Sequence, residues 1–297
     1  MGSPAGGVGG QSPTGGVRAF DRAGGRRHSR KGQPARERAM EYLPLGRTTT
    51  QIPKIGFGAW QYRGGAGVLR RAHELGAAFV DTAEAYGSEA QVARDIGDLR
   101  DEYFIATKVS PANLAYDDVL SHADASLERL ETDRIDLYQV HHPNPDIPIP
   151  ETMRAMRQLV SDGRVRFVGV SNYSVDDMKE SQDALGDVPL VANQVRYSVA
   201  ARQIEDAILP YCQEHGITAI GFSPLVKGDF GDPALERLDE VAAEVGKTPA
   251  QVLLNWVIDR PGVMAIPKTD RVERVDEAVG AVGWSLTPDQ RRRLTGD

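Results

Sequence analysis

The sequence has 297 residues, of which 40% are hydrophobic and 26% charged, a balance typical of an ordinary globular protein. No apolar run is long enough to cross a bilayer, so we expect no membrane association. The single cysteine, Cys212, excludes an intramolecular disulfide and a cysteine-rich metal site, and it favours a reducing, cytoplasmic setting. Because no His, Asp or Glu cluster has metal-ligand spacing, we also predict no metal.

Residues 1–39 differ in character from the rest of the chain. They are rich in Gly, Ser, Pro and Arg, so they bury too little apolar surface to offset the entropy of ordering. Their eight basic and two acidic residues give +6, which leaves −13 on the remainder of a chain with a net charge of −7. That acidic remainder argues against nucleic acid as the main partner. We predict a disordered tail over residues 1–39 and one folded domain over residues 40–297, with Met40 as its natural start. Activity and stability are expected to survive deletion of the tail.

The predicted strands begin after a short hairpin between Tyr42 and Ile52, which has turn residues at Gly46 and closes the bottom of a barrel. Short β-branched or aromatic runs then alternate with amphipathic stretches, the pattern of βα units. The eight predicted strands are Lys54 to Trp60, Ala78 to Thr82, Tyr103 to Val109, Ile135 to His141, Val165 to Ser171, Val191 to Arg196, Thr218 to Phe222 and Val263 to Pro267. Eight such repeats predict an α/β fold, a (β/α)8 TIM barrel, with its active site at the C-terminal ends of the strands.

Eight helices are predicted between and after these strands, and two more stand outside the repeat. Ser174 and the pair Thr248 and Pro249 are start signals for two of them. The repeat helices are Val68 to Leu75, Ser88 to Leu99, Tyr116 to Leu130, Pro150 to Ser161, Val175 to Leu185, Gln203 to His215, Ala250 to Asp259 and Arg271 to Val279. The additional helices are Pro233 to Val245 and Thr287 to Leu294.

Polar side chains lie at three successive strand ends. Asp81 is at the end of the second strand, Lys108 near the end of the third and His141 at the end of the fourth, while Tyr86 follows Asp81 in the next loop. Because these ends converge at one mouth of a barrel, the four side chains are expected to share a pocket. Each also has an ordinary structural interpretation, as a helix cap, a surface lysine or a core histidine, but their joint placement favours a site.

The four residue types together predict carbonyl reduction. The Tyr86 hydroxyl would give the carbonyl oxygen a proton, and the Lys108 ammonium would lower the tyrosine pKa from its usual value of about 10. Asp81 would be the counter-charge of Lys108, and His141 would donate a hydrogen bond to the carbonyl oxygen. Proteins have no hydride donor, so a nicotinamide cofactor is required. On a regular strand at most one of His141 and His142 faces inward, and the residues themselves do not choose between them.

The segment GAAFVDTAEAYGSE, residues 76–89, resembles the aldo-keto reductase motif in which Asp-Thr-Ala precedes Tyr-Gly-x-Glu. The resemblance continues through IATKV at 105–109, DLYQVHHP at 136–143 and VGVSN at 168–172, and it covers essentially Met40 to the end. It implies a catalytic tetrad of Asp81, Tyr86, Lys108 and His141, and thereby selects His141.

The same resemblance implies a cofactor site. Ser171, Asn172 and Gln194 would bind the nicotinamide carboxamide. Phe222 would stack on the nicotinamide ring, with Ser223 and Leu225 along the pyrophosphate. The segment IPKTD at 266–270 would hold the adenosine 2′-phosphate with Lys268, Thr269 and Arg274 at a helix N-terminus. NADPH is therefore the expected cofactor. NADH is also possible, because Asp270 lies beside the phosphate site and Ala278 replaces an asparagine common in the family.

The resemblance also implies two substrate-binding residues, Trp60 on the pocket wall and His142 where many relatives have tryptophan. The more polar wall predicts small polar carbonyls. The given sequence ends three residues after Leu294, so we expect no long C-terminal loop like that of larger relatives, and with it a permissive pocket.

The sequence thus predicts an NADPH-dependent oxidoreductase that reduces a small-molecule aldehyde or ketone to an alcohol. Two alternatives stay open: a sugar or polyol dehydrogenase on the same site, and an NADPH-binding regulatory subunit with little turnover. The oligomeric state is not predicted.

Overall fold

The computed structural model describes residues 1–2, 40–65, 67–226 and 232–296. The predicted disordered tail therefore lies outside the described residues, apart from its first two. Residues Arg38–Asp297 form one compact unit, and the fold described below belongs to it. Within the described residues, no helix is both long and apolar enough to span a membrane.

The core of this unit is a sheet of eight parallel strands in the order β10-β9-β8-β7-β6-β5-β4-β3. Hydrogen bonds from Gly56 N to the Ala265 oxygen and from Gly58 N to the Pro267 oxygen, both 3.0 Å, join the two edge strands and close the sheet. The strands are β3 Phe57–Gly58, β4 Phe79–Asp81, β5 Phe104–Val109, β6 Ile135–Val140, β7 Val165–Ser171, β8 Leu190–Arg196, β9 Thr218–Phe222 and β10 Val263–Ile266. The predicted (β/α)8 barrel is confirmed.

Strand β6 shows why these segments form central strands. All six of its residues are buried, because one face lines the barrel interior and the other packs against helices. The first predicted strand, Lys54 to Trp60, is shorter than expected. Only Phe57–Gly58 pairs regularly, and Ile55 makes a single bridge to Ala265.

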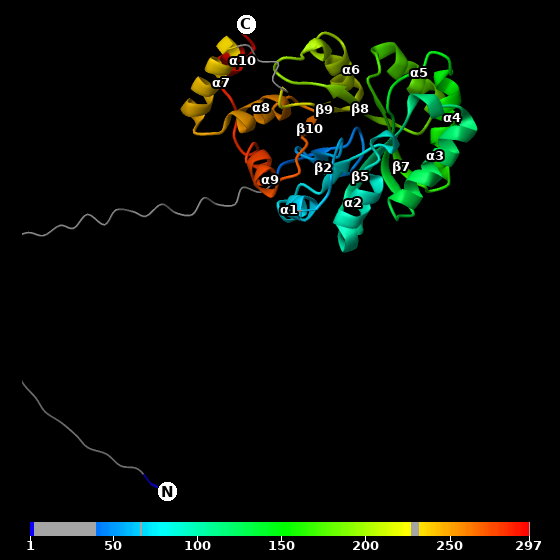
Figure 1. The fold of residues 1–297 in the computed structure, drawn as a ribbon, viewed down its shortest axis with the longest axis horizontal. Coiled ribbons are helices and arrows are strands. Elements are labelled where there is room, and N and C mark those ends of the chain that lie inside the picture. Colours follow the sequence, from blue (N-terminus) through cyan, green and yellow to red (C-terminus); the bar gives the residue numbers. More distant parts are fainter. Residues whose placement is uncertain (3–39, 66, 227–231, 297) are drawn as a thin grey trace, which may run out of the picture. The chain divides into compact units, whose positions relative to one another are not determined.

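Ten α-helices are described around the strands (Figure 1). They are α1 Val68–Glu74, α2 Glu89–Ile96, α3 Tyr116–Arg129, α4 Ile149–Ser161, α5 Val175–Leu185, α6 Ile208–His215, α7 Asp232–Val245, α8 Pro249–Ile258, α9 Val272–Val279 and α10 Pro288–Thr295. Four short 3-10 helices accompany them: η1 Glu84–Tyr86, η2 Gly97–Glu102, η3 Pro111–Asn113 and η4 Gln203–Glu205.

Both predicted helix starts are capped. The Ser174 and Thr248 side chains each accept a hydrogen bond from the third helical residue and complete a capping box. Two predicted helices are divided. The segment 203–215 becomes η4 and α6, because Ala207 leaves helical geometry at φ −144° and ψ −48°. The segment 88–99 ends as α-helix at Ile96, because Gly97 adopts a positive φ of 55°.

A two-stranded antiparallel hairpin, β1 Tyr42–Pro44 and β2 Gln51–Pro53, covers the N-terminal end of the barrel. Leu43 and Ile52 from the hairpin belong to the same apolar cluster as Phe79 and Leu137 from inside the barrel. The predicted hairpin is confirmed. It seals one end of the barrel and leaves the opposite end for a site.

Candidate active site

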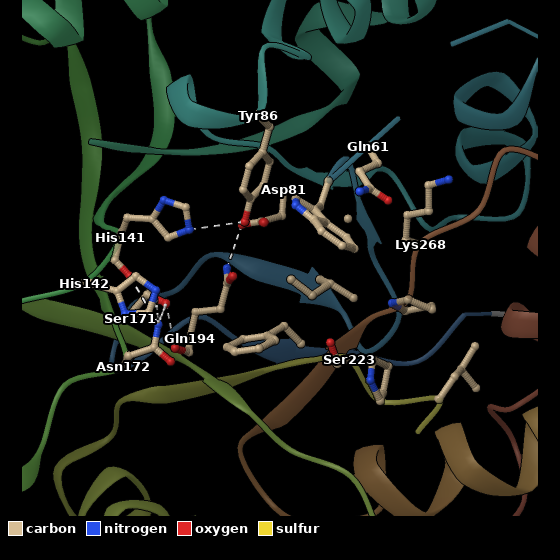
Figure 2. A pocket seen from close by; sticks show the side chains of 17 residues that line it. Gln61, Asp81, Tyr86, His141, His142, Ser171, Asn172, Gln194, Ser223 and Lys268 are labelled. Atoms are coloured by element: carbon tan, nitrogen blue, oxygen red, sulfur yellow. Dashed lines mark hydrogen bonds between the residues drawn. The ribbon is translucent and has the colours of Figure 1, made fainter. Parts of the chain in front are cut away.

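A cavity of about 890 Å³ lies at the C-terminal ends of the strands. Figure 2 shows Tyr86, His141 and His142 on one side of it and Lys268 on the other. It is lined by Gly58, Trp60, Gln61, Asp81, Tyr86, His141, His142, Ser171, Asn172, Gln194, Phe222, Ser223, Pro224, Leu225, Ile266, Pro267 and Lys268. All but three of the residues predicted for the site are in this lining, the exceptions being Lys108, Thr269 and Arg274.

Lys108 and Asp81 form a buried ion pair beneath the cavity. The Lys108 Nζ lies 2.5 Å from Asp81 Oδ2 and donates a second hydrogen bond of 2.8 Å to the Thr82 carbonyl oxygen. Neither side chain is more than 2% exposed. Burial lowers the pKa of Lys108, but the charge of Asp81 and its hydrogen bond oppose that shift. The expected counter-ion of Lys108 is therefore in place.

The second oxygen of Asp81 is held by two amide side chains. Gln194 Nε2 donates to Asp81 Oδ1 over 2.6 Å, and Gln139 Nε2 donates to the same oxygen over 3.2 Å. Gln194 was predicted as a cofactor-binding residue, whereas Gln139 was not predicted at all. Gln139 lies on β6 two residues after Leu137, which belongs to the apolar cluster inside the barrel, so strand alternation is the sequence signal that could have identified it.

Tyr86 comes to the site from η1, the turn that follows β4. Its hydroxyl lies 3.4 Å from His141 Nε2, and the two rings meet edge to face at 79°. The Lys108 Nζ lies 4.9 Å from the centre of the tyrosine ring. The structure therefore brings all four residues of the predicted tetrad together.

The pKa of Tyr86 differs from the expected direction. Burial, followed by the negative charge of Asp81, raises the tyrosine pKa, and no lowering by Lys108 is found. The physical reason is the close ion pair: Asp81 balances the ammonium charge that was expected to favour the phenolate. The hydroxyl is consequently protonated throughout the neutral pH range, as a proton donor must be.

His141 and His142 both line the cavity, whereas on a regular strand at most one of them would face inward. Strand β6 ends at Val140, and strand alternation therefore no longer applies to either histidine. Their rings stack at 5.2 Å. Burial and the nearby Lys108 charge lower the pKa of His141 to about 4 and also lower that of His142. Both rings are therefore neutral near pH 7, and only His141 reaches the tyrosine hydroxyl.

Ser171 and Asn172 form the wall next to these histidines. Ser171 Oγ donates to the Gln194 carbonyl oxygen over 2.9 Å, and Asn172 Nδ2 donates to Ser171 Oγ over 2.9 Å. Asn172 has a positive φ of 61°, in the left-handed region that asparagine tolerates. This conformation lets the Asn172 amide reach the carbonyl oxygen of His141, 3.2 Å away. The three residues predicted for the carboxamide therefore lie together.

The residues predicted to bind the 2′-phosphate lie farther from the tetrad. A second cavity of about 160 Å³ shares Leu225, Pro267 and Lys268 with the first, and Thr269 and Arg274 line it. Lys268 is paired with Asp270, and Arg274 is paired with Glu277. The two adjoining cavities thus extend from the tetrad to the N-terminal turn of α9, and the side chains of Lys268 and Arg274 line the second one. An elongated dinucleotide with a terminal phosphate fits this arrangement.

Trp60 and Gln61 stand at the rim of the cavity, and Trp60 is 45% exposed. The loop that follows them is held by Asp95 of α2, which accepts hydrogen bonds from Tyr62 Oη at 2.7 Å and Gly65 N at 2.9 Å. Gln61 has a positive φ of 54°. Within the described part of the chain, no group of three or more His, Cys, Asp or Glu side chains is arranged to hold a metal.

The sequence matches a family model described as "Aldo/keto reductase family" over residues 54–296. Methylglyoxal reductase YeaE of Escherichia coli is 36% identical, over 80% of this chain and 87% of that protein. An uncharacterized oxidoreductase of Mycobacterium tuberculosis strain H37Rv is 34% identical, over 86% of this chain and 92% of its own length.

Solved structures resemble the fold as well. The thermostable aldo-keto reductase Tm1743, in complex with the inhibitor epalrestat, has a TM-score of 0.81 and 35% identity. The match covers 86% of this chain and 99% of that one. An aldo-keto reductase from Klebsiella pneumoniae in complex with NADPH has a TM-score of 0.78 and 34% identity, over 87% and 96% of the two chains.

Proposed function

Because the chain belongs to the aldo/keto reductase family, we propose that it reduces aldehyde or ketone carbonyls to alcohols with a nicotinamide cofactor. One observation carries this proposal. The Tyr86 hydroxyl lies 3.4 Å from a neutral His141, next to a buried Lys108 and Asp81 pair, in a cavity of about 890 Å³. This arrangement supplies a proton donor and a hydrogen-bond donor to one carbonyl oxygen.

Tyr86 is the proposed acid. Its raised pKa keeps the proton on the hydroxyl until negative charge develops on the substrate oxygen. In the tautomer with its proton on Nε2, the neutral His141 donates a hydrogen bond to that oxygen and aligns it with the tyrosine. The Lys108 ammonium, 4.9 Å from the centre of the ring, offsets the negative charge of Asp81, which would otherwise oppose loss of the Tyr86 proton more strongly.

The residues present fit a nicotinamide dinucleotide. When bound, this cofactor supplies the hydride that the side chains lack. Ser171, Asn172 and Gln194 would hold the carboxamide, and Phe222, Ser223 and Leu225 follow along the same wall. In the second cavity Lys268, Thr269 and Arg274 would hold a 2′-phosphate.

NADPH is the proposed cofactor because two cations line the far cavity, and the complexes of the Klebsiella proteins with NADP and NADPH support it. Asp270 pairs with Lys268 and competes with a phosphate for its charge, so NADH is a weaker second cofactor.

Small neutral carbonyl compounds are the proposed substrates. Among the residues that the structure describes, Lys268 is the one lysine or arginine in the lining of the large cavity, and it lies across the cavity from Tyr86 (Figure 2). The wall near Tyr86 therefore offers hydrogen bonds from His142 and Asn172 rather than a cation for a carboxylate. The likeness to the methylglyoxal reductase of Escherichia coli supports small dicarbonyls as the first compounds to test.

The test is an NADPH-oxidation screen against dicarbonyls, small aldehydes, keto-sugars and aromatic aldehydes, with NADH in parallel. We expect turnover of small dicarbonyls and a higher kcat/KM with NADPH. Tyr86→Phe should lower kcat by about 10² to 10⁴-fold, because the general acid is lost. Full activity of Tyr86→Phe would refute the assigned acid. NADPH binding without turnover would instead favour a regulatory protein, and faster alcohol oxidation would favour a dehydrogenase.

A further inference from the structure

Glu84 has a largely buried carboxylate that no step of the proposed reaction uses. It begins η1, two residues before Tyr86, and its side chain is 8% exposed. Its Oε1 accepts hydrogen bonds from Ser110 N at 2.6 Å and from Asn113 Nδ2 at 2.8 Å. Its Oε2 lies 2.6 Å from His122 Nδ1. Burial alone would raise the pKa of Glu84, but its hydrogen bonds hold the pKa below the usual value, so the group is an anion at neutral pH.

The partners of Glu84 come from the neighbouring βα unit. Ser110 directly follows Val109, the last residue of β5, and Lys108 precedes Val109 on that strand. Asn113 ends η3, and His122 lies in α3. The carboxylate therefore joins the turn that carries Tyr86 to the end of the strand that carries Lys108.

Hydrogen bonds hold the residues on both sides of the turn to β5: Thr82 N donates to the Ala106 oxygen at 2.8 Å, and Thr107 Oγ1 donates to Glu89 Oε1 at 2.6 Å. Within the turn, Tyr86 N donates to the Ala83 oxygen at 3.0 Å and Gly87 N donates to the Glu84 oxygen at 3.3 Å. These local bonds define the shape of the turn, but they do not tie it to β5. The Glu84 side chain adds a tie from the turn itself, through two donors, Ser110 N and Asn113 Nδ2, and through the ring of His122.

We propose that Glu84 is a positioning residue for Tyr86: by clamping η1 to the Ser110 amide, it sets the tyrosine hydroxyl in reach of both His141 and the substrate oxygen. This inference rests on the proposed carbonyl reduction. Proton transfer is sensitive to geometry, and a displacement of about 1 Å costs on the order of 10²-fold in rate. Glu84 acts through the backbone and the tyrosine, and it does not touch the reacting atoms.

The decisive variant is Glu84→Gln, which keeps the size of the side chain. A glutamine has no charge and one acceptor oxygen in place of two, so its hydrogen bonds to Ser110 and Asn113 are weaker, and it binds His122 only through a tautomer with Nδ1 as the acceptor. We expect kcat to fall by about 10- to 100-fold, while the KM for NADPH changes by less than about twofold, because the cofactor residues are untouched. An unchanged kcat in an active wild-type background would overturn the positioning role alone.

Asp136, which lies on β6, supplies a matched control because its carboxylate also binds β5. Its Oδ2 accepts a hydrogen bond of 3.0 Å from Ile105 N and lies 3.2 Å from Arg100 Nη1, at the opposite end of β5 from Ser110. Asp136→Asn should lower the melting temperature but leave kcat within about twofold of wild type. If Asp136→Asn lowered kcat as much as Glu84→Gln does, the loss would reflect general destabilisation, and the proposal would be overturned.

Two further measurements separate positioning from folding. In a Tyr86→Phe background, Glu84→Gln should change the residual rate by less than about twofold, because it acts through the tyrosine hydroxyl. Amide hydrogen exchange at Ser110 should be faster in Glu84→Ala, in the absence of any substrate. Additive losses in the double variant, or unchanged exchange at Ser110, would overturn the clamp. A wild-type protein that reduces no carbonyl would overturn the proposed function and this role with it, even if Ser110 exchange behaved as expected.

Discussion

The two ends of the barrel draw on the same strands but hold opposite kinds of side chain. At the N-terminal end, Phe79 of β4 packs in the cluster with Ile52 of the hairpin and stacks on Phe104 of β5 at 5.1 Å. At the C-terminal end, Asp81 lies two residues further along β4 and pairs with Lys108 of β5. Apolar burial at one end stabilises the fold, while the other end holds buried charge that the fold must tolerate.

Residues that stabilise the fold and residues whose burial opposes folding therefore lie at opposite ends of the strands. A buried ion pair adds little net stability because desolvation opposes attraction, so Lys108 and Asp81 are not explained by folding. The apolar cluster around Ile52 has no polar group for chemistry. Substitutions at the two ends should therefore separate loss of activity from loss of stability.

The largest effect is expected at the charged end, from Lys108→Met. Removing the ammonium leaves Asp81 as an uncompensated buried anion, which should destabilise the fold by about 3–5 kcal/mol. Loss of the cation beside Tyr86 should also lower kcat by about 10² to 10⁴-fold. Chemical denaturation and steady-state kinetics measure the two losses. The double variant Asp81→Leu with Lys108→Met should regain stability but no activity, and a double variant as unstable as Lys108→Met would contradict this account.

At the apolar end, Ile52→Ala should lower stability without lowering activity. Ile52 is fully buried where the hairpin meets the barrel, so its truncation should destabilise the fold by about 2–5 kcal/mol. At 25 °C and in the absence of denaturant, kcat/KM should stay within about twofold of wild type, because the tetrad is at the other end. A large fall in kcat/KM of the folded variant would show that the two ends are coupled.

The pH dependence tests the neutral His141. With a pKa of about 4 in the fold and an ordinary value of 6.5, the folded protein leaves this ring neutral where the unfolded chain protonates it. The unfolded state thus binds the extra proton between these values, and stability falls as the pH decreases through that window. The melting temperature of wild type should therefore fall more steeply than that of His141→Gln from pH 6.5 to 4. Parallel curves would show that the ring is not held neutral. The kcat/KM profile should have no inflection near pH 6.5.

The smallest effect is expected at the rim, from Asp270→Asn. Removing the carboxylate frees Lys268 for a phosphate, and the exposed pair is worth only about 0.2–1 kcal/mol. The KM for NADPH should fall by up to about fivefold, with little change in the KM for NADH. Competition assays with both cofactors give the ratio. An equal change for both cofactors would mean that Lys268 does not contact the 2′-phosphate.

Much of the fold follows from local patterns. Apolar runs such as Ile135–Val140 predict central strands. Ser174 and Thr248 predict helix starts because each can cap its own helix. The irregularity at Ala207 was not predictable, because alanine favours a helix and only the surrounding chain imposes a break there.

The sequence by itself determined the eightfold repeat, the family, and the four side chains at the strand ends, since these depend on local periodicity and on motifs. Only the tertiary structure decided how those side chains act on one another. Gln139 and Gln194 hold one oxygen of Asp81 while Lys108 takes the other. That local balance of charge, together with burial, raises the pKa of Tyr86 where the residue types alone predicted a fall.

Contacts between the loops at the mouth of the barrel also could not be predicted from the sequence. His141 and His142 share the cavity because β6 stops at Val140, and Glu84 reaches Ser110 because two βα units lie side by side. Electrostatic and hydrogen-bond energies depend on distance and burial between residues far apart in the chain. A sequence motif identifies such residues, but only the tertiary structure determines the distances between them.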